Sequence, residues 1–220
     1  ILARHSVTLA GATALLAVAL ALLLGYAARV HRGRGMRWVH RASGLGYALP
    51  GSVIAVGVLI PVTRIDHILA AVAREVGGVE VGLLLTGTIA ALVYACLVRY
   101  LSAAVQTVDA GLARITPQMD QAARSLGHSP AQTLVRVHLP LLRGSLLTAA
   151  LLVFIDVMKE LPATLVMRPF NFDTLATQTF VLASDERLAE ASTAALAIVA
   201  VGLVPMVLLC RQIARGQRVS

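Results

Sequence analysis

Three charged residues lie close together in an otherwise apolar stretch. Asp156, Lys159 and Glu160 stand in the run "LLVFIDVMKELP". Their i, i+3 and i+4 spacing predicts that they share one face of a helix. Charged side chains at membrane depth are costly and usually face a bundle interior or a wet cavity. Two interpretations stay open: the three residues line a translocation path, or Lys159 neutralises a neighbouring carboxylate and the cluster is structural.

The rest of the sequence offers no pattern typical of an enzyme or a stable metal site. Two carboxylates beside a lysine are far from a full coordination shell, and the six histidines lack ligand spacing. Cys96 and Cys210 belong to no CxxC or Cys/His cluster, which predicts that both are small apolar residues. We therefore predict no catalytic residue, no metal site and no directly bound cofactor.

Composition assigns the chain to the integral membrane proteins. Hydrophobic residues make up 58% of the sequence and charged residues 14%, a balance that soluble domains do not show. About five apolar runs are long enough to cross a bilayer as helices of roughly 20 residues, and they are continuous rather than alternating. We predict an all-α polytopic bundle in a single domain, 1–220, with spans near 6–28, 44–62, 79–101, 144–168 and 188–210.

Arginine placement predicts the orientation. The formal charge of +8 comes from basic residues beside the spans, which indicates topology and not a nucleic-acid partner. Three arginine-rich segments alternate so that they fall on one side of the membrane, which the positive-inside rule makes cytoplasmic. The N-terminus is then outside and the C-terminus cytoplasmic. The arginines of that side are Arg29, Arg32, Arg34, Arg37, Arg41, Arg114, Arg124, Arg136, Arg143, Arg211, Arg215 and Arg218.

A polar insert at 106–143 interrupts the apolar pattern and is predicted to face the cytoplasm. Thr116 and the proline after it are typical of a helix start. Gly127 suits a left-handed helix end, and Ser129 begins a second helix with a glutamine in the capping-box position. Pro140 is expected to end that helix. The pattern predicts two short helices joined at a glycine turn; an amphipathic helix lying on lipid is the alternative.

The residue order of the insert resembles the EAA loop of ABC importer permeases. That pattern is Glu-Ala-Ala, three residues, Gly, nine residues, then Ile-x-Leu-Pro. The same spacing is present here. The matching residues, which the resemblance implies are the ATPase-coupling residues, are Gln121, Ala122, Ala123, Gly127, Val137, Leu139 and Pro140.

In that family the loop docks on a separate cytoplasmic ATP-binding subunit, and nucleotide-driven closure rocks two permease halves. The chain itself has no GxxxxGK[ST] motif, so we expect it not to be an enzyme, with ATP used by the partner subunit. Two departures stand: Gln121 replaces the glutamate and Val137 replaces the isoleucine. Asp120 is expected to substitute for the missing charge, although it lies about 100° away around a helix.

A second resemblance is to the permeases of ferric-iron ABC importers, in particular to their second half. It covers about residues 6 to 212 and is carried by "DVMKELPATLVMRPFNFDTLA", "LASDERLAEA" and "GYALPGSVIAVGVLIP". It implies an ABC type I importer permease core in the bacterial inner membrane. It also implies ferric iron as cargo, for which Asp156 and Glu160 would offer hard oxygen ligands.

The implied partners are ATP-binding subunits, a periplasmic or lipid-anchored substrate-binding protein, membrane lipid, and a second permease half in cis or in trans. The first residue is Ile, and with the outside start this is expected of the C-terminal half of a longer two-half permease. Thiamine, a polyamine, sulfate or a phosphonate stay open as cargoes. A membrane anchor or an intramembrane enzyme is the alternative from another class.

Overall fold

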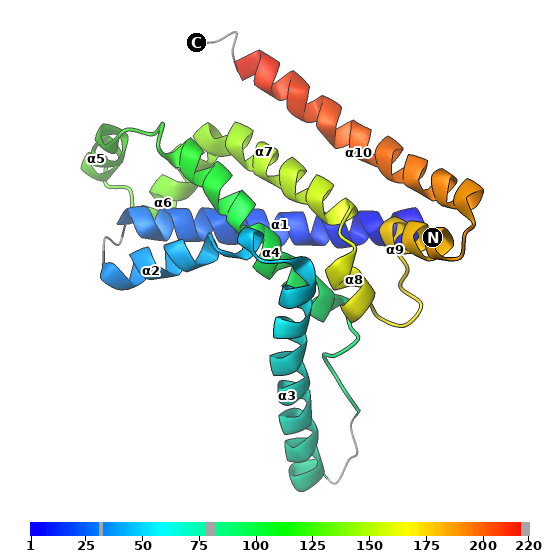
Figure 1. The fold of residues 1–220 in the computed structure, drawn as a ribbon. Helices are drawn as coiled ribbons and strands as arrows, with labels where there is room; N and C mark the ends of the chain where they lie inside the picture. Colours follow the sequence, from blue (N-terminus) through cyan, green and yellow to red (C-terminus); the bar gives the residue numbers. More distant parts are fainter. Residues whose placement is uncertain (31–32, 78–81, 217–220) are drawn as a thin grey trace.

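The computed structural model describes residues 1–30, 33–77 and 82–216, and every regular element in these ranges is helical (Figure 1). Arg32 and Arg218, used for the predicted orientation, lie outside the described residues. In chain order the elements are α1 (Leu2–Val30), α2 (Arg34–Ser43), η1 (Gly46–Ala48), α3 (Gly51–Gly77), α4 (Ile89–Leu112), α5 (Pro117–Ser125), α6 (Pro130–Thr133), η2 (Leu134–His138), α7 (Leu139–Met158), α8 (Pro162–Met167), α9 (Leu175–Ser184) and α10 (Leu188–Gly216).

Five helical runs in the described ranges are long and apolar enough to cross a membrane. They are Leu2–Val30, Gly51–Glu75, Ile89–Leu112, Pro130–Met158 and Leu188–Leu208. The predicted all-α bundle with about five spans is confirmed.

The predicted limits of the second and third spans are wrong. The second span begins at Gly51 instead of 44, because the residues before it form η1, a short turn against α4. The third runs from Ile89 to Leu112 instead of over 79–101. Thr88 fixes its start, since its hydroxyl accepts a hydrogen bond from the backbone N–H of Ala91 at 3.2 Å.

The fourth span begins inside the polar insert, not at 144, and ends at Met158, not at 168. The prediction that Pro140 ends the second insert helix is wrong. Instead, η2 is a π-helical turn in which the N–H of Leu139 donates to the carbonyl of Leu134, five residues back. A proline inside an α-helix lacks a donor and crowds the preceding turn. The wider turn accommodates Pro140 and leaves the insert continuous with α7.

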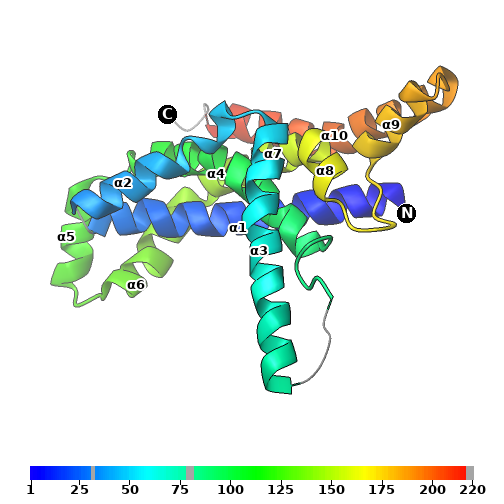
Figure 2. The same cartoon turned by 60° about the horizontal axis from the view of Figure 1, so that its bottom comes forward.

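Helices α1, α4 and α7 pack against one another to form the core (Figures 1 and 2). α1 contributes a stripe of buried small residues at helical spacing: Ala10, Ala14, Ala17, Ala21 and Gly25. Small side chains let helix backbones approach closely, which is how membrane helices gain packing energy when lipid supplies no hydrophobic drive.

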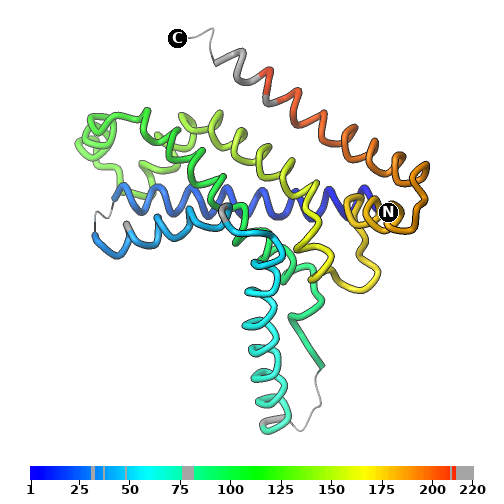
Figure 3. The backbone as a smooth tube through the Cα atoms, viewed as in Figure 1, coloured from blue at the N-terminus to red at the C-terminus, as the bar shows by residue number. Residues whose placement is uncertain are grey.

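α3 runs away from this core, and both views show its far end projecting alone (Figures 1 and 2). The chain returns to α4 through the non-helical segment 82–88 (Figure 3). Asp66, which has no exposed surface, fixes this return. Its carboxylate accepts the backbone N–H groups of Leu84, Leu85 and Thr86 at 3.0, 2.7 and 2.7 Å. The side chain thus satisfies backbone donors that would otherwise be unpaired in an apolar setting.

Gly46 brings η1 into direct contact with the backbone of α4. A Cβ atom at this position would lie 1.9 Å from the carbonyl oxygen of Val98. Only glycine fits, so the entry of the chain into α3 depends on this residue.

We predict that Gly46→Ala lowers the thermal stability of the purified protein in detergent. The methyl group forces η1 and α4 apart, and overpacking of this kind costs about 1–3 kcal/mol. The matched control is Gly57→Ala in α3, where a Cβ meets no atom within 4 Å and alanine is the better helix former by about 1 kcal/mol. Thermal unfolding of both variants should show a loss only for Gly46→Ala; equal midpoints would refute the close contact.

Candidate coupling insert and intramembrane charge cluster

The insert begins as predicted, with a short helix (α5), a glycine turn and a second helix start, but the second helix is not short because α6 and η2 continue into α7. Gly127 joins them with φ at +80°, and its N–H donates to the carbonyl of Arg124 at 2.9 Å while that of His128 donates to Ala123 at 3.0 Å. These two bonds are a Schellman helix end. Ser129 and Gln132 then form the predicted capping box. Thr116 sits at the first cap, but its side chain makes no capping hydrogen bond.

The predicted coupling residues do not all face the same way. Ala123 is 4% exposed and Val137 is half-buried, so the small size of Ala123 serves packing within the chain. Those with surface available to a partner are Gln121, Ala122, Gly127, Leu139 and Pro140.

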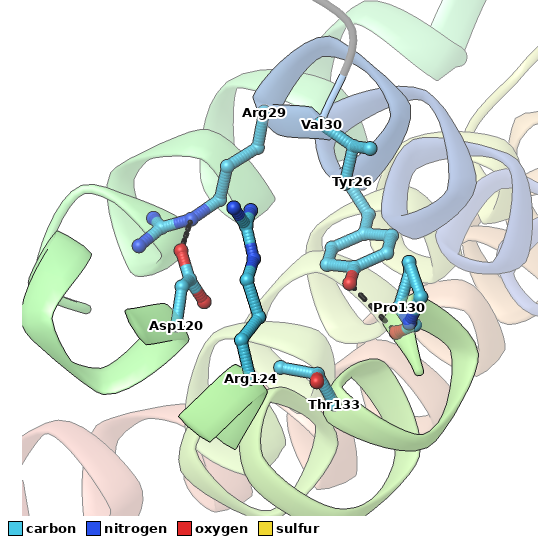
Figure 4. A pocket seen from close by; sticks show the side chains of 7 residues that line it. All are labelled: Tyr26, Arg29, Val30, Asp120, Arg124, Pro130 and Thr133. Atoms are coloured by element: carbon cyan, nitrogen blue, oxygen red, sulfur yellow. Dashed lines mark hydrogen bonds and ion pairs between the residues drawn. The ribbon is translucent and has the colours of Figure 1, made fainter. Parts of the chain in front are cut away.

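Asp120 is turned inward, which corrects the expectation that it replaces the missing glutamate at a partner surface. One carboxylate oxygen accepts Arg29 Nε at 2.8 Å, and the other lies 2.6 Å from His138 Nε2. His138 has no exposed surface. Figure 4 shows Arg29 and Asp120 facing each other, with Tyr26 reaching Pro130 beside them.

The contacts of Asp120 keep it ionised at neutral pH. Burial alone raises the pKa of this carboxyl. The hydrogen bonds and charges of Arg29 and His138 outweigh burial, so the pKa lies below its usual value. Asp120 is therefore negatively charged and paired within the chain.

The three charged residues of the fourth span do not share one helical face, and this part of the prediction is wrong. α7 ends at Met158, so Glu160 leaves the helix before i+4 geometry can apply. Lys159 pairs with Asp156 at 2.9 Å, and its side chain is 64% exposed. Glu160 is only 3% exposed and turns away from both.

Glu160 forms a separate ion pair with Arg99 of α4. Arg99 Nη1 lies 3.1 and 3.0 Å from the two carboxylate oxygens. Glu160 also accepts the hydroxyl of Tyr100 and, at 3.0 Å, the backbone N–H of Ala163 in α8. Sequence reasoning missed Arg99, although an arginine within an apolar span signals that a buried carboxylate lies nearby.

Gly51 at the start of α3 covers this pair. A Cβ there would lie 1.8 Å from Arg99 Nη1 and 3.0 Å from Glu160 Oε1. The pair therefore joins the start of α3, the middle of α4 and the connection between α7 and α8 at one point.

The cluster carries no net formal charge, because Lys159 balances Asp156 and Arg99 balances Glu160. The described residues contain no group of three or more His, Cys, Asp or Glu placed to hold a metal ion. The electrostatics of this charge cluster thus favour neither a cationic nor an anionic cargo.

The arrangement of helices is that of a known class of membrane protein. The crystal structure of a bacterial alginate ABC transporter in complex with an alginate pentasaccharide-bound periplasmic protein superposes with a TM-score of 0.71. It is 15% identical and covers 94% of this chain and 75% of that one. A second structure of a bacterial ABC transporter that imports alginate gives a TM-score of 0.66 over 100% of this chain, again at 15% identity. The fold is that of an ABC importer permease, as predicted.

The chain belongs to the family of inner membrane components of binding-protein-dependent transport systems, whose model matches residues 17–219. It is therefore a multi-pass inner-membrane permease component and not an enzyme.

Two named relatives are similar to this chain over most of its length. The Fe(3+)-transport system permease protein FbpB 2 of Haemophilus influenzae is 30% identical over 205 residues, which are 93% of this chain but only 37% of that protein. The putative 2-aminoethylphosphonate transport system permease protein PhnV of Salmonella typhimurium is 27% identical over 206 residues, 94% of this chain and 72% of the relative. The chain thus spans well under half of its iron-transport relative.

We predict that breaking the Arg99–Glu160 pair destabilises the fold far more than breaking the exposed one. Arg99→Gln leaves a buried carboxylate unpaired, which typically costs about 3–5 kcal/mol. Lys159→Met removes an exposed pair worth about 0–1 kcal/mol.

Thermal unfolding in detergent of Arg99→Gln, Glu160→Gln, their double variant and Lys159→Met checks this. The double variant should lose less stability than the two single losses added together. Equal losses for Arg99→Gln and Lys159→Met would contradict the assignment of Glu160 to Arg99.

Proposed function

We propose that this chain is the transmembrane permease subunit of an ATP-driven, binding-protein-dependent importer for ferric iron. The observation that carries the proposal is the insert, whose second helix is continuous with a membrane span from Pro130 to Met158. Displacement of such an insert moves α7 directly, because no flexible loop separates them. Docking on a separate ATPase would supply that displacement.

The proposed partners follow from this role. The insert, with Gln121, Ala122, Gly127, Leu139 and Pro140 exposed, would meet a cytoplasmic ATP-binding subunit. A substrate-binding protein would deliver cargo on the other side, as in the alginate transporter crystallised with its periplasmic protein. A second permease half, in cis or in trans, would complete a two-fold pathway. The orientation, N-terminus outside and C-terminus cytoplasmic, rests on the arginine distribution.

Ferric iron is supported by the relative at 30% identity and by the fourth-span motif. A phosphonate is the second candidate, because PhnV matches at 27% over a larger share of its own length. We propose that Asp156 and Lys159, whose amine is exposed, face the translocation path. Glu160, sealed against Arg99, would shape the path without contacting cargo.

The cargo is tested by deleting the gene in its host. We expect uptake of radioactive ferric iron under iron limitation to be lost and to return with a wild-type copy. Growth on 2-aminoethylphosphonate as sole phosphorus source should be unaffected. Loss of phosphonate growth with normal iron uptake would establish the second candidate, and loss of neither would overturn both cargoes.

The coupling role is tested at the glycine turn. Gly127→Leu places a side chain in the left-handed region, at a cost of about 1–2 kcal/mol, so the two insert helices should lose their relative geometry. We expect membrane insertion to survive while ATPase stimulation by the binding protein falls severalfold. Gly202→Leu in α10 is the control, since a Cβ there meets no atom within 4 Å. Gln121→Glu should also be tolerated, because it restores the residue of the resembled loop. Normal stimulation in a stably expressed Gly127→Leu protein would remove the turn from the mechanism.

A further inference from the structure

We infer that Arg29, supported by Tyr26, is a positioning residue that makes the coupling insert move as one body with α1. The inference rests on the proposed function. It adds a second mechanical connection, from the insert to the first membrane helix, beside the covalent one through α7.

Arg29 holds three separate parts of the chain with one guanidinium group. It donates to Asp120 at 2.8 Å, to the carbonyl of Leu112 at 2.8 Å and to the carbonyl of Ile115 at 2.7 Å. Leu112 is the last residue of α4, Ile115 lies in the connector between α4 and α5 (113–116), and Asp120 is in α5. The carbonyls at a helix end have no partner within the helix, and a cation is favoured there. A single side chain of α1 thus fixes the end of α4 and the start of the insert together.

Tyr26 lies one turn earlier on the same face of α1 and holds the second insert helix. Its hydroxyl donates to the carbonyl of Pro130 at 2.7 Å. Its ring meets His138 edge-on, with centroids 5.2 Å apart. His138 in turn contacts Asp120 at 2.6 Å. Tyr26 and Arg29 of α1 therefore contact α5, α6 and η2 through a connected set of interactions.

These polar contacts attach α5 to the membrane helices, beside the one buried residue of α5, Ala123. Backbone contact between α5 and the rest of the described chain is sparse. A cavity of about 300 Å³ lies beside the contacts (Figure 4). It is lined by Tyr26, Arg29, Val30, Asp120, Arg124, Pro130 and Thr133. With open space on one side, loss of Arg29 leaves the Asp120–His138 contact and the buried Ala123 to hold α5.

The hydrogen bonds of Arg29 hold the insert in a more fixed geometry than a lysine at this position would. The side chains of Arg29 and Asp120 are 21% and 18% exposed, so water competes little with the pair. A guanidinium donates in fixed directions to several acceptors at once, whereas an ammonium on a flexible stem does not. Since α1 packs on α4 and α7, a push on the insert reaches all three core helices.

The test uses the complete transporter, with its ATP-binding subunit and binding protein, in proteoliposomes. Arg29→Gln, Arg29→Lys and Tyr26→Phe are compared with wild type and with Arg114→Gln, an exposed arginine of the same connector. The readouts are ferric iron imported per ATP hydrolysed and the amount of ATP-binding subunit that co-purifies.

We expect Arg29→Gln to retain the ATP-binding subunit while iron imported per ATP falls about fivefold or more, the usual lower range of a coupling effect. Arg29→Lys should fall nearly as far, Tyr26→Phe by a smaller factor, and Arg114→Gln not at all. If Arg29→Gln does not assemble, a lower ratio in assembled Arg29→Lys or Tyr26→Phe carries the same conclusion.

An unchanged ratio in assembled Arg29→Lys and Tyr26→Phe overturns the inference and leaves the proposed function standing. Wild-type protein that shows no ATP-dependent uptake instead overturns the proposed function.

Discussion

A charge inside a low-dielectric membrane must find a partner, and this requirement decides where the helices of this chain meet. Arg99 lies in the middle of the third span and Glu160 just beyond the fourth, and neither is tolerable there alone. Their pairing brings the end of α7 and the start of α8 onto α4, with Gly51 of α3 directly above. Asp66 likewise pairs with the backbone N–H groups of the non-helical segment before α4. The irregular parts of the fold are thus placed by polar satisfaction, and the regular core by small-residue packing.

The same rule governs the cytoplasmic insert. Arg29 donates to the carbonyls of Leu112 and Ile115 and to the carboxylate of Asp120, and so adds a donor where α4 ends and the insert begins. The π-helical turn at η2 lets Pro140 lie within a continuous helix. The insert is consequently joined to α7 by its backbone and to α1 by side chains. No loop separates the second insert helix from α7, so a displacement of that helix passes directly into the fourth span.

Local patterns in the sequence predicted local structure well. Apolar run length predicted the all-α bundle and the number of spans, and Gly127, Ser129 and Gln132 predicted the helix pair, because caps and turns depend on neighbouring residues only. Long-range pairing was not predictable in this way. Arg99, Tyr26 and His138 were missed because their partners lie tens of residues away, and Asp120 was assigned outward because periodicity alone does not say which face a bundle covers. Glu160 was misplaced for a local reason: an i+4 argument fails once the helix has ended at Met158.

The pairing of charges also bears on how cargo would pass. Two free carboxylates would hold a trivalent cation tightly, and a path that binds its cargo tightly cannot release it. Here Glu160 is buried in an ion pair with Arg99, and Asp156 is paired with Lys159. A cargo passing along this surface would meet a neutral pair with one exposed amine, which attracts neither charge strongly. Under the proposed function, selection among cargoes is then the task of the substrate-binding protein, and the permease contributes a path that opens in step with its insert. Such a division would let one type of permease serve systems named for different cargoes, as are the two relatives that are 30% and 27% identical to this chain.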